Sequence, residues 1–342
     1  MKNVPKLGHF IWIGGALPSQ NQACVRSFTK NDDWHFNLWI DPYNLLVHER
    51  RSRVKQKVDQ KIQAGKDKHK VEQKQWDKVV KAVGKEGTDE NTKKYLGKKY
   101  DLRAEDLDRI ADTNYQQLSD FCRDNRLGLC SVAEFQGGKS FSLYRQEMVA
   151  RNANFGSASD ILRVDILLKL GGVYFDTDVY CREPLGDIPA HENGALWSAV
   201  DSSISSKDVK VTRAQWQDDN WWKQFDDIIP ICNSIIACHP DSQALQDYRN
   251  LIEQNHSGKM SETQRLQYYR NIRTDTIQKT GPTAAMKSSG LTAKKDEVWD
   301  ARMKLELEAG KDLMQQKLLE FRDEVYFPMY KISDQFYHDW LK

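Results

Sequence analysis

Residues 157–179, SASDILRVDILLKLGGVYFDTDV, decide the fold of this chain. They predict a helix that begins about Asp160 and carries apolar side chains on most faces, so that it is deeply packed. A carboxylate in the first turn of a helix caps or stabilises it. Arg163 follows three residues later and is expected on the same face as Asp160. Gly171 and Gly172 then end the helix and allow a tight turn into an apolar strand.

Two carboxylates, Asp176 and Asp178, interrupt that apolar strand. If the strand persists through them, both side chains face the same side, because strand residues alternate. Two carboxylates so close together repel each other, and apolar surroundings raise the cost. A hard divalent cation such as Mg²⁺ or Mn²⁺ relieves the repulsion, and it completes its coordination with water and substrate phosphates. The pattern therefore predicts a metal that holds a diphosphate at a strand end.

The same D-x-D spacing occurs a second time, at Asp106 and Asp108. That copy lies in a polar helical stretch, where two solvated acids need no explanation. D-x-D triplets also arise by chance, so spacing alone is weak support for a metal site. The apolar strand and the double glycine before Asp176 make the first copy the candidate.

The composition of the chain limits the class of protein to which it can belong. A chain of 342 residues with ten tryptophans and thirteen tyrosines can bury a sizeable core and is too aromatic to be disordered. No run approaches the roughly 18 apolar residues of a membrane span, and the start lacks the apolar core of a signal peptide. Six cysteines without a C-x-x-C pair predict reduced, buried thiols. We expect residues 1–342 to form one large α/β domain.

Residues 49–99 differ in charge from the rest of the chain. They contain 17 Lys and Arg against 8 Asp and Glu, a local excess of nine, so the remainder carries a net charge of −7 within a total of +2. Apolar residues recur at spacings of three and four, as in amphipathic helices with thin apolar stripes. We predict a basic helical insertion over about residues 46–100, with a hairpin broken near Gly65 and standing off the main body.

Strands and helices alternate around this insertion. LGHFIWIGG, residues 7–15, and WHFNLWIDP, residues 34–42, are apolar runs typical of strands. A helix capped by Ser19 is expected between them. Further helices are predicted over 104–124 and 144–152. Such alternation favours a parallel or mixed sheet with helices on both faces.

These segments resemble a known family. The stretch 157–179, together with HFIWIGG at 9–15 and FNLWID at 36–41, is similar to GT-A glycosyltransferases related to the large clostridial glucosylating toxins. Similar bacterial effectors and tyrosine-modifying toxin domains share the pattern. The resemblance runs from residue 9 to about residue 240, and an aromatic tail extends it to the C-terminus. It implies a Rossmann-like mixed sheet flanked by helices and an enzyme that uses nucleotide sugars.

The resemblance implies roles for individual residues. Trp12 would stack on the uracil of a UDP-sugar, and the backbone of Ile13 would read the edge of the base. Tyr174 would lie near the ribose, and Asp178 would bind Mn²⁺ or Mg²⁺ directly. Asp176 would contact the ribose and metal-bound water. The remaining candidates would contact the donor sugar or its phosphate: Asp160, Arg163 and Asn233. Without the resemblance, Trp12 and Tyr174 are equally well interpreted as core aromatics, and Asp160 with Arg163 as a helix ion pair.

The C-terminal tail, YKISDQFYHDWLK at 330–342, departs from the family pattern. Relatives close the donor site with a loop that carries a serine or acid metal ligand and a tryptophan reaching the leaving phosphate. Trp340 matches the tryptophan. His338 is our candidate for the third metal ligand, with Ser333 and Asp334 as alternatives. We expect residues 326–342 to form a lid.

Family relatives retain the configuration of the transferred sugar, and we expect the same here. Small residues, Cys232 and Ser234, flank Asn233, and in relatives small flanking residues admit N-acetylglucosamine. UDP-GlcNAc is therefore favoured over UDP-glucose. The acceptor is expected to be a Tyr or Thr hydroxyl of a host protein, a Rho-type small GTPase above all. The family implies a secreted toxin or effector that acts in the host cytoplasm, and this chain could be a domain excised from a longer protein.

The basic insertion suits an acidic partner, either a host GTPase or an anionic membrane surface, although a merely solvated helical face explains it equally well. Nucleic acid is disfavoured because only Trp76 and Tyr95 could stack on bases there. Two other functions stay open. One is a glycan-building transferase with a saccharide acceptor, and the other is a catalytically inactive binding module.

Overall fold

The computed structural model describes residues 1–84, 87–149, 153–199, 212–217, 231–258, 272–289 and 322–334. Its centre is a six-stranded mixed sheet in the order β4-β3-β2-β5-β9-β8. The four strands from β4 to β5 are parallel, and β9 runs antiparallel to both β5 and β8. The strands are β2 (Leu7–Trp12), β3 (His35–Ile40), β4 (Gly128–Ser131), β5 (Gly172–Phe175), β8 (Ala195–Ala199) and β9 (Ile231–Cys238).

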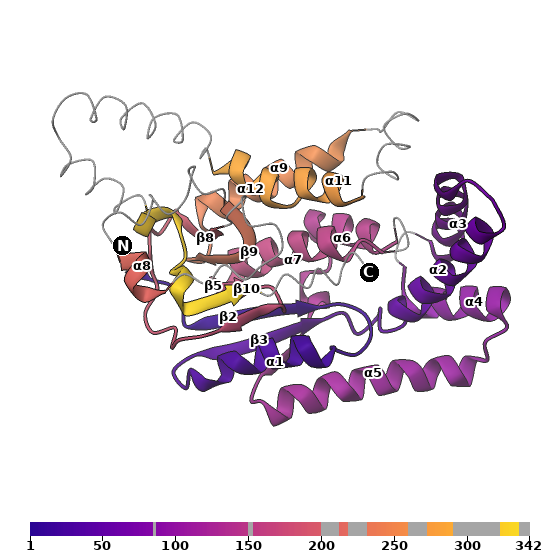
Figure 1. Ribbon diagram of the computed structural model, residues 1–342, viewed down its shortest axis with the longest axis horizontal. Helices are drawn as coiled ribbons and strands as arrows, with labels where there is room; N and C mark the ends of the chain where they lie inside the picture. The colour runs from indigo at the N-terminus through magenta and orange to yellow at the C-terminus, as the bar shows by residue number, and fades with distance from the viewer. Residues whose placement is uncertain are drawn as a thin grey trace.

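Helices cover both faces of this sheet (Figure 1). One layer lies above the sheet in that view: α6 (Lys139–Val149), α7 (Phe155–Leu170), α9 (Gln243–Ser257), α11 (Ile272–Lys279) and α12 (Pro282–Ser288). The opposite face carries α1 (Ser19–Ser27) and α5 (Ala104–Asp124). The sequence-based expectation of a mixed sheet between helices is confirmed.

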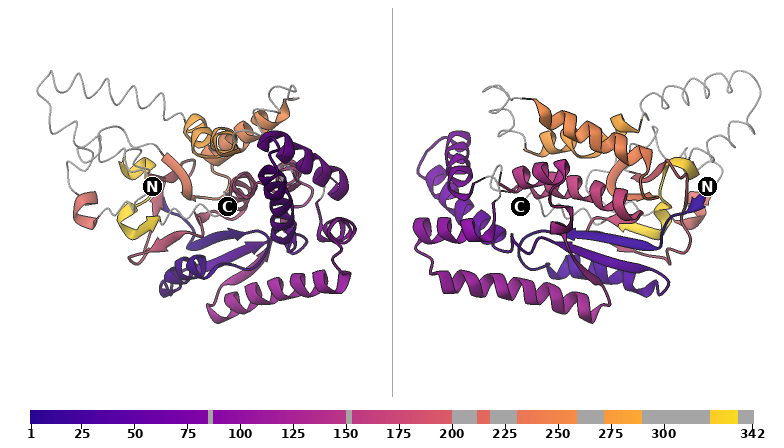
Figure 2. Two further views of the ribbon diagram at one scale, coloured as in Figure 1. Left: turned by 45° about the vertical axis from the view of Figure 1, so that its right-hand side comes forward. Right: turned by 180° about the vertical axis from the view of Figure 1, so that it is seen from behind.

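The basic segment forms three helices: α2 (Val47–Gln63), α3 (Lys68–Val83) and α4 (Asp89–Tyr100). The α2–α3 turn includes Gly65, as predicted. The three helices form a block beyond the carboxyl ends of β2 and β3 (Figures 1 and 2). They are tied to the body by Asp89, whose carboxylate accepts hydrogen bonds from the amides of Leu45 and Leu46 at 2.8 and 2.9 Å.

Short elements complete the described chain. Two antiparallel pairs lie apart from the main sheet, β1 with β7 and β6 with β10. Their bounds, with those of the remaining helices, are β1 (Lys2–Asn3), β6 (Val179–Cys181), β7 (Pro189–Ala190), β10 (Ile332–Asp334), α8 (Arg213–Gln217), η1 (Phe28–Lys30), η2 (Val132–Phe135) and η5 (Met329–Lys331). In the described part of the chain, no helix is both long and apolar enough to cross a membrane.

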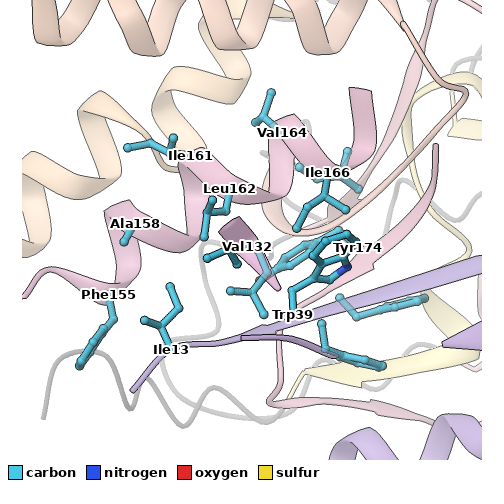
Figure 3. Packing of buried hydrophobic residues seen from close by; sticks show 14 of the residues in the cluster. Ile13, Trp39, Val132, Phe155, Ala158, Ile161, Leu162, Val164, Ile166 and Tyr174 are labelled. Atoms are coloured by element: carbon cyan, nitrogen blue, oxygen red, sulfur yellow. The ribbon is translucent and has the colours of Figure 1, made fainter. Parts of the chain in front are cut away.

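Helix α7 is buried on nearly all sides, which explains why its sequence is apolar at almost every position. It lies between the sheet and the helices α6, α9 and α11. Figure 3 shows Leu162 and Ile166 directed toward the ring of Tyr174 and the indole of Trp39 on the sheet, with Ile161 on the opposite side of the helix. The predicted deep packing is confirmed.

The turn from α7 into β5 depends on glycine. Gly172 has φ +88°, and a Cβ there would lie 2.3 Å from the carbonyl oxygen of Leu7. The close approach lets β5 pair with β2. His9 of β2 reinforces the junction, since its Nε2 lies 3.0 Å from the carbonyl oxygen of Gly171 and its Nδ1 accepts from Trp39 Nε1 at 3.2 Å. Burial lowers the pKa of His9 to about 4, so the ring is neutral.

Two predicted helix starts are wrong. Ser19 is the first residue of α1 rather than its cap, and Pro18 occupies the cap position in extended conformation. Helix α7 begins at Phe155, not about Asp160, because the side chain of Asn154 caps it by accepting from the amide of Ser157. Asp160 therefore lies in the second helical turn, where its carboxylate faces side chains instead of free amides.

Candidate functional site

Asp160 is buried in a cage of hydrogen-bond donors. Asn233 Nδ2 donates to its Oδ1 at 2.8 Å, and Thr280 Oγ1 donates to its Oδ2 at 2.8 Å. Arg163 Nη2 lies 3.1 Å from Oδ1. Burial raises the pKa of Asp160 to about 7, against the opposing effect of the Arg163 charge. The predicted placement of Asp160 and Arg163 on one helix face is confirmed.

Arg163 links the helix to the strand end. Its Nη2 lies 3.1 Å from Asp176 Oδ1 as well as 3.1 Å from Asp160 Oδ1, so one nitrogen bridges two carboxylates. Its Nη1 donates to the carbonyl of Asn233. The guanidinium lies over the ring of Tyr174, with Cζ 4.2 Å from the centroid. Burial opposes the charge of Arg163, but the carboxylates outweigh that effect and raise its pKa.

Tyr174 orients the first acid of the D-x-D motif. Its hydroxyl donates to Asp176 Oδ1 at 2.7 Å, the same oxygen that contacts Arg163. Tyr174 is fully buried, whereas the Asp176 side chain is 33% exposed. Asp176 thus stands at the boundary between the buried network and solvent, where a substrate can reach it.

The strand ends one residue before the motif, which corrects the predicted geometry. Strand β5 stops at Phe175, and the amide of Val179 donates to the carbonyl of Asp176 at 3.0 Å, closing a turn. Asp176 and Asp178 are therefore placed by a turn, not by strand alternation. Asn21 of α1 holds this turn, since its Nδ2 lies 3.2 Å from Thr177 Oγ1.

Asp176 and Asp178 are both partly exposed and offer the oxygen ligands that Mg²⁺ and Mn²⁺ prefer. Within the ranges given above, no group of three or more His, Cys, Asp or Glu side chains could hold a metal ion. Two carboxylates suit Mg²⁺ or Mn²⁺ when water and substrate phosphates fill the remaining positions. His338 and Trp340 lie outside the described residues.

The start of the tail lies beside this turn. Strand β10 pairs antiparallel with β6, and Asp334 is opposite Val179 while Ser333 is opposite Tyr180. Main-chain pairing thus places Asp334 opposite Val179, the residue that follows the D-x-D motif.

Trp12 ends β2 at the same edge of the sheet. Its Nε1 donates to the carbonyl of Gly15 at 3.2 Å, and its ring stacks on His48 with centroids 6.2 Å apart and planes at 14°. His48 stacks in turn on Phe155, the first residue of α7, at 4.9 Å. Ile13 is buried beside Trp12. A row of stacked rings thus lies at the carboxyl end of β2, with Trp12 partly exposed and Phe155 buried.

Sequence reasoning missed several residues of this site. Thr280 and Tyr248 hold Asp160 and Asn233, with Tyr248 OH 3.1 Å from Asn233 Nδ2. Asn44 is fully buried, donates to Asp41 Oδ2 at 2.8 Å, and has an Oδ1 without a partner in the described residues. The signal available in the sequence was an asparagine shortly after the predicted strand 34–42. Thr280 had none, because it is 120 residues from Asp160.

The sequence of this chain matches a known protein family. A family model of the TcdA/TcdB catalytic glycosyltransferase domain matches residues 6–182. That match covers more than half of the chain and includes Trp12, Asp160, Arg163 and the D-x-D turn. The chain belongs to this family. It is accordingly a glycosyltransferase of the bacterial toxin type.

Individual relatives agree with the family assignment. Toxin B of Clostridioides difficile is 27% identical over 207 residues, which is 52% of this chain and 8% of that protein. Subversion of eukaryotic traffic protein A of Legionella pneumophila is 23% identical over 272 residues, 76% of this chain and 28% of that protein. This glycosyltransferase chain thus spans less than a third of either relative.

Solved structures confirm the fold. The catalytic domain of alpha-toxin from Clostridium novyi superposes with a TM-score of 0.65 at 15% identity, covering 84% of this chain and 72% of that domain. The UDP-bound glycosyltransferase domain of the YGT toxin gives 0.57 at 15% identity, covering 86% and 79%. The predicted GT-A fold is therefore confirmed for this glycosyltransferase.

Proposed function

We propose that this glycosyltransferase moves a sugar from a UDP-sugar to a Tyr or Thr hydroxyl of a host protein, with Mn²⁺ or Mg²⁺ and retention of configuration. The observation that carries the proposal is the bridge from Asp160 through Arg163 to Asp176. It joins a buried carboxylate, suited to sugar hydroxyls, to an exposed D-x-D turn, suited to a metal and a diphosphate.

Different side chains would contact different parts of the UDP-sugar. Trp12 would stack on the base, with the backbone of Ile13 at its edge, and Tyr174 would keep Asp176 oriented toward the ribose. Asp160 and Asn233 would bind sugar hydroxyls. Asp176 and Asp178 would hold the divalent cation, which when bound supplies positive charge opposite the leaving diphosphate.

The site would speed the transfer mainly by stabilising the negative charge of the leaving diphosphate. Negative charge grows on the departing diphosphate, and Arg163 already lies in a buried position beside Asp176, where a cation acts strongly. Trp340 would donate its indole N–H to the same phosphate, and His338 would add a metal ligand, once the tail covers the site. Retention needs no separate base, because the departing diphosphate can accept the proton of the acceptor.

The donor sugar and the acceptor are the finer parts of the proposal. Cys232 and Ser234, both small, flank Asn233 in β9 and support UDP-GlcNAc over UDP-glucose. A small GTPase of the Rho type is the proposed acceptor, by likeness to the toxin family, and action in the host cytoplasm follows from it. A glycan acceptor is the second candidate.

The two D-x-D motifs provide a matched test. Asp106 and Asp108 lie on α5 and pair with Arg103 and Lys93 at the surface, so they serve as the control. Replacing Asp176 and Asp178 by Asn should lower Mn²⁺-dependent hydrolysis of UDP-GlcNAc by about 10²-fold or more. Replacing Asp106 and Asp108 by Asn should leave it unchanged. Thermal stabilisation by Mn²⁺ with UDP should disappear only in the first variant.

Equal hydrolysis by both variants would refute the metal site. Repeating the assay with UDP-glucose, and following the product anomer by NMR, tests the donor and the stereochemistry. A strong preference for glucose or an inverted product would contradict those two points. Intact mass spectrometry of purified small GTPases, and of soluble saccharides as the alternative, identifies the acceptor class.

A further inference from the structure

Six lysines from α2, α3, α4 and the α2–α3 turn, called here the lysine cluster, lie around Lys57 and Lys61. Lys57 and Lys61 are one turn apart on α2, and Lys74 and Lys78 are one turn apart on α3, so each pair shares a helix face. The six members are Lys57, Lys61, Lys66, Lys74, Lys78 and Lys99. Their ammonium groups are close enough to repel one another across the α2–α3 hairpin.

Two ion pairs of the insertion, Arg53 with Glu49 and Lys94 with Glu90, join residues outside this cluster. Burial lowers the pKa of Lys57, and Lys99 and Lys78 lower it further, with no carboxylate acting in the opposite direction. The pKa of Lys61 is lowered in the same way, by burial and then by its lysine neighbours. The fold thus holds together cations that repel each other.

The position of the cluster relates it to the proposed active site. Helix α2 begins at Val47, just after β3 ends, and its second residue, His48, stacks on Trp12. Trp12 is the last residue of β2 and Asp176 follows the end of β5. The hairpin lies beyond the same edge of the sheet (Figure 1). A protein that brings a hydroxyl side chain to that edge would lie beside α2 and α3.

We propose that the lysine cluster is a docking surface for an acidic face of the protein acceptor. The proposal rests on the proposed function, since it assigns to that acceptor a second contact away from the transferred sugar. Opposite charges on the two surfaces would speed their encounter and fix the orientation of the acceptor. The lysines bind no donor and take no part in the chemistry.

The structure favours a protein over a membrane or a nucleic acid. A helix that binds at a membrane interface inserts an apolar face, whereas Val54, Val58 and Val79 of this hairpin are buried. Single-stranded nucleic acid binds through exposed aromatic rings, and Trp76 and Tyr95 are buried as well. Val80 of α3 is exposed, but one apolar side chain does not form a membrane-binding face, so the charge of the cluster suits an acidic protein surface.

The test compares two variants of equal charge. The cluster variant replaces Lys61, Lys74 and Lys78 by Glu. The control variant replaces by Glu three exposed lysines of the insertion outside the cluster, Lys55 on α2, Lys68 on α3 and Lys98 on α4. Purified Rho-type GTPases serve as acceptors, with UDP-GlcNAc and Mn²⁺. We expect the cluster variant to lose about ten-fold or more in kcat/KM for the acceptor, mainly through KM. Donor hydrolysis should match the wild type in both variants.

Salt dependence adds a second readout. Raising the ionic strength should lower the wild-type kcat/KM for the acceptor toward that of the cluster variant, which itself should respond little. Equal losses in the two variants, or no loss in the cluster variant, would overturn the proposal. So would cluster-dependent sedimentation with phosphatidylserine vesicles unaccompanied by any change in kcat/KM.

The experiments distinguish a wrong choice of acceptor protein from a wrong assignment of the lysine cluster as a docking surface. If no GTPase is modified, the small-GTPase part of the proposed function is wrong. Binding of labelled poly-L-glutamate, measured by anisotropy, then tests the cluster alone. Docking stands if the cluster variant loses this binding while the control variant keeps it, and it falls if both bind alike. Thermal unfolding of both variants confirms that they are folded.

Discussion

Arg163 shows how one side chain assembles a site at the scale of residues. Its guanidinium contacts Asp160, Asp176 and the carbonyl of Asn233, which come from a helix, a turn and a strand. A buried cation with several acceptors is costly to remove, because its partners are then left unpaired. Arg163 is therefore both a candidate donor ligand and a structural link.

Thr280 allows a residue-scale prediction. Its hydroxyl donates to Asp160 Oδ2 in a fully buried position, so Thr280→Val leaves a carboxylate oxygen without that donor. Urea unfolding at about pH 8, where the carboxylate is ionised, should show a loss of about 1–3 kcal/mol in the free energy of unfolding. Thr280→Ser should restore most of it.

Thr113→Val is the control for this prediction, since Thr113 is exposed on α5. It should change the free energy of unfolding by about 0.5 kcal/mol at most. If Thr280→Val and Thr113→Val behave alike, the hydrogen bond to Asp160 does not stabilise the protein, and the arrangement of the cage described above would need revision.

At the scale of elements, α7 is positioned by contacts made around its first turn. Asn154 caps the helix and also donates to Glu147 Oε2 of α6 at 2.8 Å. Glu147 Oε1 lies 3.6 Å from His256 Nε2 of α9, and both side chains are almost fully buried. The start of the helix that carries Asp160 is thus coupled to an ion pair between two other helices.

The ion pair predicts a dependence of stability on pH. Burial alone would lower the pKa of His256, but the hydrogen bond and charge of Glu147 outweigh it and raise the pKa above its ordinary value of 6.5. The stabilisation is therefore complete below about pH 6.5 and is lost as pH rises through the raised pKa. His256→Gln removes it.

The measurement is urea unfolding of the wild type and of His256→Gln between about pH 6 and pH 9. The wild type should exceed the variant by about 3 kcal/mol at the low end, and the difference should shrink as pH rises. His69→Gln removes an exposed pair with Glu72 on α3 and should change little at any pH. A difference that grows with pH would contradict the pairing.

At the scale of the whole molecule, one hydrophobic core extends across the central sheet and into the insertion, and most of the cysteines are buried. None of the six cysteines, all of which lie in the described residues, forms a disulfide, and four of them are buried: Cys24, Cys122, Cys181 and Cys238. Burial raises the pKa of Cys122 and of Cys238 to about 12, which keeps the thiols protonated and unreactive. The prediction of reduced thiols is confirmed for all six cysteines, and the prediction of burial is confirmed for four of them.

Thiol labelling should therefore report global unfolding. Ellman's reagent should reach only Cys130 and Cys232 readily in the native protein, because these two are partly exposed. The other four should react at the rate of unfolding. In denaturant without reductant, all six thiols of the chain should react. Fewer than six would reveal a disulfide and contradict this description.

Much of the architecture followed from local patterns. Helix α5 was predicted over 104–124 and is found at Ala104–Asp124, because an amphipathic repeat bounded by polar residues leaves little choice. The start of α7 was misplaced, because Asn154 caps the helix and Ser157 and Asp160 both resemble cap residues in sequence. The strand before Asp176 was extended too far, since an alternating pattern does not reveal where a turn closes.

The sequence by itself determined the order of strands and helices, the Asp160–Arg163 pair and the D-x-D motif, because helix and strand periods act over a few residues. Only the tertiary structure decided that Asn233 and Thr280 close around Asp160, and that β10 pairs with β6 directly after the D-x-D motif. These contacts join segments separated by 70 or more residues. They depend on how the sheet orders its strands and how the helices pack on it, which no local pattern encodes.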